Sequence, residues 1–329
     1  MTAIKNARRF LRKVNFWNLA VYAVLILISY QFLYPLIRMI TTSLMSSSDI
    51  INPAVNWIPR AWSFGNLRIA FNVLGIFNPF FDAEGNLNNA LFNSLWWSGS
   101  LALGQTLVSS MTGYAFARFN FKFKRFWFVM VIVSFIMPTP IILIPRLMMF
   151  QTVQQMFEFQ LIGTAIPQWA LAVTGQGIFS AILILIFYNF TRLIPRALDE
   201  AAAIDGANSF QIFYHVILKL SITTLLVVFL FSFVWNWNET YITSTLMRDR
   251  IPTMTNNLSR FESLFSQYAP NIPSGYGGGA AGMNPEANRI NEAYKMSGTF
   301  ISIIPLFIIY MLVQRQFIKG IENAGITGE

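Results

Sequence analysis

Long runs of apolar residues dominate this 329-residue chain and restrict what it can fold into. A helix needs about 20 apolar residues, at a rise of about 1.5 Å each, to cross the hydrocarbon core of a bilayer. Only 11% of the residues are charged, compared with about 25% in soluble domains. The sequence therefore predicts an all-α, polytopic membrane protein with about six transmembrane helices, at residues 16–40, 91–116, 126–150, 161–190, 221–244 and 298–318.

The net charge of +9 is a topology signal rather than a sign of nucleic-acid binding. Most Lys and Arg residues flank apolar runs, and cytoplasmic loops of membrane proteins are enriched in these residues. The first apolar run is too long for a signal peptide, so it is expected to be an uncleaved anchor. We expect both termini to be cytoplasmic, with an outer loop at about 245–297, and lipid around the spans. The predicted cytoplasmic parts are the basic N-terminus at 1–15, the segments 117–125 and 191–219, and the tail at 319–329.

Several classes of chemistry are excluded by residue types that the chain lacks. It has no cysteine and a single histidine, His215, so thiolate catalysis, zinc–thiolate sites and a Ser-His triad are not expected. It also lacks the G-x-x-x-x-G-K-[ST] phosphate loop, so ATP cannot bind here by that route. We expect no catalytic residue, no metal and no cofactor in this chain.

Proline residues interrupt the third predicted span. Pro138 and Pro140 lie near the middle of residues 126–150, and each removes a backbone donor from the helix. Within a membrane, irregular backbone is tolerated where it is buried in protein or lines a cavity. The sequence therefore predicts a broken helix beside a cavity at this point.

The cytoplasmic segment 194–219 reads as two short helices with a sharp break. Pro195 suits the first helical position, and Asp199 and Glu200 suit the N-terminal end of the helix dipole. Gly206 can adopt the left-handed conformation that stops a helix. Asn208 or Ser209 can then cap the next helix.

This segment resembles the EAA loop of permease subunits of bacterial ABC importers. The match in residue and spacing rests on Glu200, Ala201, Ala202, Asp205, Gly206, Ala207 and Phe213. Lys219 departs from the pattern, because the family usually has proline there. The resemblance covers most of the chain and is nearest to the carbohydrate-uptake group, on the side of the smaller maltose-type permease. It is carried further by Asn93-Ser94-Leu95, Tyr114 to Phe119, Met137-Pro138, Ile144-Pro145, Trp235-Asn236, and Gln314 to Phe317.

The resemblance implies an ABC type I importer permease fold, with a six-span domain at 16–318. It implies a second permease subunit, two ATPase subunits that bind the ATP, and an extracytoplasmic solute-binding protein. The seven matched residues are then the ATPase-coupling site, seated in a cleft of the ATPase. The Gly-rich part of the outer loop, Gly275 to Gly282, is expected to reach toward the binding protein.

Two other classes of protein remain as alternatives. A self-powered secondary transporter would need buried charges for ion coupling, and Arg38, Arg146, Arg192 and Glu239 lie near the ends of predicted spans. A membrane-embedded enzyme would need a nucleophile or a carboxylate pair, and neither is evident.

The sequence limits the substrate only loosely. Sugars bind to aromatic faces and planar polar groups, and both occur in Trp235, Asn236, Trp237, Asn238 and Glu239. An interfacial aromatic belt explains the same residues equally well. The expected substrate is a sugar or an oligosaccharide, and a non-sugar solute such as a glycerol phosphate is the alternative.

Overall fold

The computed structural model describes residues 16–55, 57–248, 250–271 and 291–326. The chain divides into two compact units, Met1–Ala70 with Ser266–Ile301 and Phe71–Phe265 with Ser302–Glu329. Within the described ranges the chain is helical and has no β-strand. The expectations for the N-terminus at 1–15, for Gly275–Gly282 and for residues 327–329 lie outside the described residues.

In the first unit, α2 (Phe16–Ser43) is followed by α3 (Ser47–Ile51), and the unit includes the start of α17 (Glu292–Ile326). The Ser43 carbonyl accepts hydrogen bonds from Asn66 Nδ2 at 3.0 Å and from Ser297 Oγ at 3.2 Å. These bonds join the end of α2 to α4 (Gly65–Val73) and α17. The most apolar stretch of α2 buries none of its residues within the chain, so lipid or another subunit must cover it.

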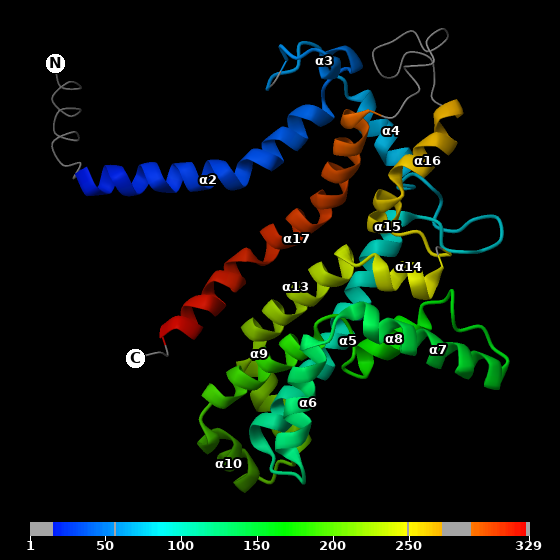
Figure 1. The fold of residues 1–329 in the computed structure, drawn as a ribbon. Coiled ribbons are helices and arrows are strands. Elements are labelled where there is room, and N and C mark those ends of the chain that lie inside the picture. The colour runs from blue at the N-terminus through cyan, green and yellow to red at the C-terminus, as the bar shows by residue number, and fades with distance from the viewer. Residues whose placement is uncertain (1–15, 56, 249, 272–290, 327–329) are drawn as a thin grey trace. The chain divides into compact units, whose positions relative to one another are not determined.

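The second unit is built around α5 (Ala90–Arg118), which packs against α8 (Ile166–Val173), α9 (Ser180–Leu193) and α13 (Ile222–Asn238) (Figure 1). Gly113 sets the approach of α5 to α9, because a Cβ atom there would lie 2.8 Å from the Tyr188 backbone nitrogen. Glycine at such a crossing lets two helix backbones approach closely.

The third predicted span is broken, as its prolines indicated. It consists of α6 (Lys124–Ile136) and α7 (Thr139–Phe157), which meet at an angle of 106°. The break falls at Met137 and Pro138, both of which have extended backbone.

Two other predicted spans are also interrupted, which the sequence reasoning missed. Residues 161–190 were expected to form one helix, but α8 ends at Val173 and α9 begins at Ser180. The turn between them holds Gly175 at φ +73° and Phe179 at φ +49°, and positive φ cannot continue a right-handed helix. Residues 221–244 are divided between α13 and α14 (Tyr241–Met247).

The remaining helices are short. They are α10 (Arg196–Ile204), α11 (Ser209–Ile212), the π-helix η1 (Phe213–Ile217), α12 (Leu218–Leu220), α15 (Met254–Ser259), α16 (Phe261–Tyr268) and the 3-10 helix η2 (Ala269–Asn271).

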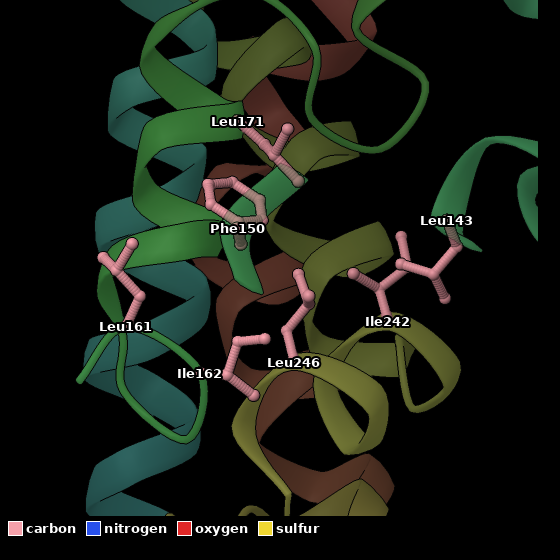
Figure 2. Packing of buried hydrophobic residues seen from close by; sticks show 7 residues of the cluster. All are labelled: Leu143, Phe150, Leu161, Ile162, Leu171, Ile242 and Leu246. Atoms are coloured by element: carbon pink, nitrogen blue, oxygen red, sulfur yellow. The ribbon is translucent and has the colours of Figure 1, made fainter. Parts of the chain in front are cut away.

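Seven buried apolar side chains join α7, α8 and α14 in the second unit. Figure 2 shows this cluster, in which Leu143 and Ile242 face each other, and its members are Leu143, Phe150, Leu161, Ile162, Leu171, Ile242 and Leu246. Because interiors are close-packed, the cluster holds the second half of the broken span against the neighbouring helices.

Among the described residues, two helices are long and apolar enough to cross a membrane unaided, at Trp17–Ser43 and Glu292–Arg315. Counting each bent helix pair as one span raises the number to as many as five. The 29-residue α5 is also long enough, at about 43 Å, but it buries several polar residues against its neighbours, most of them Ser.

Candidate functional site

The EAA loop begins with a helix that ends in a defined stop. The backbone N–H of Ala207 donates to the carbonyl of Ala202 at 3.0 Å, and that of Gly206 donates to Ala203 at 3.1 Å. Gly206 has φ +86°. This is the Schellman arrangement, in which a left-handed glycine lets the chain satisfy the last carbonyls of a helix. The predicted role of Gly206 as a helix stop is confirmed.

The second helix starts at once with a capping box. Asn208 Oδ1 accepts from the Gln211 N–H at 2.9 Å, and Gln211 Oε1 accepts from the Asn208 N–H at 2.8 Å. Asn208, one of two residues predicted to cap this helix, is therefore the cap. Pro195 lies one residue earlier than expected, as the N-cap of α10. Because backbone groups at the end of α10 and at the start of α11 have hydrogen-bond partners, the break between the two helices is a well-defined corner.

The inner side of the EAA loop packs against α5, in the same unit of the chain. Phe213 is buried and its ring lies 5.2 Å from that of Tyr114 in α5. Both belong to a core cluster against which Ala202 and Ala207 are partly buried. Three of the seven predicted coupling residues, Phe213, Ala202 and Ala207, thus anchor the loop from within.

An arginine at the end of α5 adds a polar anchor. Arg118 Nε lies 2.6 Å from Asp199 Oδ2, and Arg118 Nη2 donates to the Ile194 carbonyl at 2.8 Å. The Arg118 side chain is only 7% exposed and that of Asp199 is 17% exposed. Burial raises the pKa of Asp199, and the guanidiniums of Arg118 and Arg196 oppose this shift. One guanidinium therefore connects α5 to the end of α9 and to the first turn of α10.

The outer side of the loop is exposed. Glu200, Ala201, Asp205 and Gly206 all face solvent, as do the apolar side chains of Leu198, Ile204, Phe210 and Tyr214. Ile204 is 86% exposed. Exposed apolar groups gathered beside charged ones are typical of a protein-binding surface.

The chain enters α13 without the usual proline. Ser221 has φ −98° and ψ 10° and separates helices that meet at 83°. Its buried hydroxyl donates to the Ile217 carbonyl at 2.6 Å. A hydroxyl bonded back onto the helix bends it, so Ser221 forms the bend although Lys219 stands where the family has proline.

A second candidate site is a cavity of about 600 Å³ beside the broken span. Its walls come from both sides of the break, from the turn between α8 and α9, and from α14. Arg146 in α7 lines it and donates from Nη2 to Gln176 Oε1 at 3.2 Å. The cavity predicted beside the proline pair is therefore present.

Strain and close packing hold the turn that lines this cavity. Phe179 has left-handed backbone at φ +49°, which costs a residue with a side chain about 1–2 kcal/mol. Such outliers cluster at functional sites. At Gly177 any side chain would overlap with the amide of Gln105. That buried amide donates to Ser180 Oγ and to the Ile178 carbonyl, each at 3.3 Å.

The predicted substrate residues are dispersed. Asn236 Nδ2 donates to Gln105 Oε1 at 2.8 Å, and Asn236 lines a separate pocket of about 20 Å³ to which Arg146 also contributes. Trp235 packs edge-on against Phe179, at 4.9 Å between ring centres. Ser232 also donates to the Gln105 side chain.

The other three predicted residues have structural contacts elsewhere. Trp237 is buried and stacks on Phe233. Asn238 is exposed and donates to the Val234 carbonyl at 3.0 Å. Glu239 accepts from the first N–H groups of α14, at 2.9 Å from the nitrogens of Ile242 and Thr243.

Three functional candidates were overlooked in the sequence. Arg118 was considered only as a cytoplasmic basic residue and as part of the Tyr114 to Phe119 match, and Ile204 was not singled out. Arg146 was placed near the end of a span, whereas it lies in the middle of α7. A charge inside an apolar run was the available signal for Arg146. The described residues contain no group of three or more His, Cys, Asp or Glu side chains that could hold a metal ion.

Comparisons with known proteins find relatives that span nearly the whole chain. The chain is 25% identical over 303 residues to the arabinooligosaccharides transport system permease protein AraQ of Halalkalibacterium halodurans, covering 92% of this chain and 93% of the relative. It is 24% identical over 311 residues to the sn-glycerol-3-phosphate transport system permease protein UgpE of Brucella abortus, covering 92% and 95%.

The fold is similar to a solved structure as well. A chain of a bacterial ABC transporter involved in the import of the acidic polysaccharide alginate matches with a TM-score of 0.64 and 18% identity, over 92% of this chain and 96% of that one. Residues 105–323 match the family described as binding-protein-dependent transport system inner membrane component. The chain belongs to that family and has the all-α type I importer permease fold.

Proposed function

We propose that this chain is the permease subunit of an ATP-driven importer of sugars or oligosaccharides, and that the EAA loop couples it to a separate ATPase. The observation that carries the proposal is the two-sided EAA loop. Its inner side is fixed to α5 by Arg118 and Phe213, and its outer side offers Glu200 and Ile204 to a partner. A force applied to the outer side would be passed directly to α5.

The coupling step follows from this arrangement. When the ATPase subunits close on ATP, the cleft that holds α10 moves and carries the EAA loop with it. Because the corner at Gly206 is well defined on both sides, α10 and α11 move as one body. Differential contact of the ATPase with two positions of the loop shifts the spans between outward and inward access.

The proposal includes partners and an orientation. A second permease covers the exposed apolar faces, two ATPase subunits bind and hydrolyse the ATP, and a solute-binding protein delivers substrate. Both termini and the EAA loop are cytoplasmic, as the positions of Lys and Arg favour. This chain itself binds no nucleotide and catalyses no reaction.

The substrate class rests on the relatives and on the cavity. AraQ is named for arabinooligosaccharides, which supports a sugar. UgpE is named for sn-glycerol-3-phosphate, which supports the alternative of a phosphorylated solute. The cavity has aromatic and amide groups of the kind that bind hydroxylated solutes, with Asn236 beside it and Trp235 behind Phe179.

Co-purification tests the assignment of the EAA loop. Burying an isoleucine side chain is worth about 1.5–3 kcal/mol, so Ile204→Ser is expected to weaken binding of the ATPase by about 10- to 100-fold. Glu200→Ala is expected to weaken it as well. Ile51→Ser is the matched control, because Ile51 is 79% exposed and lies between the first two predicted spans, in the segment 41–90, which is expected to face outward, on the side opposite the EAA loop. Normal ATPase binding by both EAA-loop variants would refute the assignment.

A further inference from the structure

The cavity beside the broken span has one charged group in its lining. Arg146 is that group, and no Asp or Glu side chain is among the lining residues. Within the described part of the chain, the Arg146 guanidinium has a neutral partner, Gln176, at 3.2 Å and forms no ion pair. The described residues therefore leave the cavity with an uncompensated positive charge.

An uncompensated cation in such a place requires an explanation. Arg146 is partly buried in the middle of an apolar helix, where a charge costs free energy unless it is paired. Ionisable residues within membrane segments usually face a cavity and mark a substrate or ion pathway. Guanidinium groups match the planar geometry of carboxylates and phosphates.

The rest of the lining suits a sugar that has one anionic group. Thr139, Gln176 and Ser180 supply neutral polar groups, and Phe135 and Phe179 supply aromatic walls. A volume of about 600 Å³ lies within the range of about 300–1,000 Å³ that is typical of small-molecule sites. The strained backbone at Phe179 holds one of these walls in place.

We propose that Arg146 and Gln176 form an anion subsite in the transport path, which binds the carboxylate of a uronate sugar or the phosphate of a sugar phosphate. This inference rests on the proposed function, because it names the substrate class of the same importer. Arg146 supplies the charge, and Gln176 holds the guanidinium toward the cavity and adds a neutral amide.

Thiol chemistry measures the local charge without any transport partner. The full chain has no native cysteine, so Met149→Cys places a single thiol in the cavity lining, one helical turn from Arg146, and leaves Gln176 in place. The ratio of its reaction rates with an anionic and a cationic methanethiosulfonate is expected to fall about tenfold when Arg146→Gln is added, which corresponds to one charge about 6 Å away that acts oppositely on the two reagents at a dielectric near that of water. Arg125→Gln removes an exposed arginine from α6 and is the matched control. An equal ratio in all three proteins would overturn the proposal.

Protection of the same thiol identifies the anion. A uronate trisaccharide, a glucose phosphate and a neutral trisaccharide are each added before labelling with an uncharged maleimide. Slower labelling with either acidic sugar, and not with the neutral one, supports the subsite and distinguishes carboxylate from phosphate. Equal protection by the neutral sugar, or protection by none of the three, contradicts it.

Uptake by the assembled importer separates this proposal from the proposed function. Arg146→Gln is expected to reduce uptake of the acidic sugar by about 10- to 100-fold, as for loss of a charged hydrogen bond, while Arg146→Lys retains part of the activity. Equal loss for acidic and neutral sugars, or loss of the second permease from the complex, would make Arg146 an assembly residue and overturn the subsite. If the unaltered importer transports no sugar, the proposed function is wrong, and the thiol ratio still decides whether the cavity attracts anions.

Discussion

Replacing Gly206 isolates the geometry of the EAA loop from its packing. Gly206 has φ +86°, and a Cβ atom added there would meet nothing within 4 Å. A substitution therefore costs backbone strain alone, about 1–2 kcal/mol for Val. Asn tolerates left-handed backbone better than most residues, so Gly206→Asn should cost least and Gly206→Ala should be intermediate.

The structure also limits where this strain is released. If the corner opens, the two hydrogen bonds that end α10, from Ala207 and Gly206, are lost, at about 1 kcal/mol each. The opening would rotate α10 relative to α11, while Phe213 and its core cluster stay in place. We therefore expect a folded, membrane-inserted protein whose EAA loop is misdirected.

The assay is ATP hydrolysis by the assembled importer in response to substrate-loaded binding protein. The stimulation of ATP hydrolysis should fall in the order Gly, Asn, Ala, Val at position 206. Each variant should still elute as an intact, monodisperse complex in detergent. Two results would refute the reasoning. One is normal stimulation in Gly206→Val, and the other is an Asn variant as impaired as the Val variant, since that would make the loss independent of backbone conformation.

Three further perturbations test other parts of the structure. Arg118→Ala removes the arginine that contacts the Asp199 carboxylate and leaves only Arg196 to favour its charge. The loss should cost about 1.5–3 kcal/mol, measured by thermal unfolding in detergent. Arg118→Lys should recover only part, and no loss in either variant would contradict the anchor. Gly177→Ala should slow substrate uptake and lower the unfolding temperature, because the added Cβ overlaps with the buried amide of Gln105. An unchanged unfolding temperature would show that the turn is not close-packed. A single cysteine at Gln267 should react with an impermeant maleimide added from outside, and one at Ala203 should react only after the membrane is permeabilised; both residues are exposed. The reverse pattern would show that the predicted topology is inverted.

Features governed by neighbouring residues were predictable from sequence. The helix stop at Gly206 and the cap at Asn208 depend on φ preference and on a side chain three residues away, and both signals are local. The break at Pro138 is local for the same reason, because proline removes its own donor.

Features governed by long-range contacts were not predictable. Arg118 meets Asp199 across 81 positions in the chain, and nothing near Arg118 indicates that contact. Phe179 adopts left-handed backbone in a turn that is packed against Gln105 around Gly177, whereas an isolated Phe disfavours positive φ.

Reconstituted uptake tests the central claim, that a separate ATPase drives this permease through the EAA loop. Proteoliposomes contain the full chain with its second permease, with or without the ATPase subunits, and uptake of labelled sugar is measured with ATP or with an imposed ion gradient. The account predicts uptake only when the ATPase, ATP and the loaded binding protein are all present, and its loss in Gly206→Val. Uptake driven by the ion gradient without the ATPase would contradict the account.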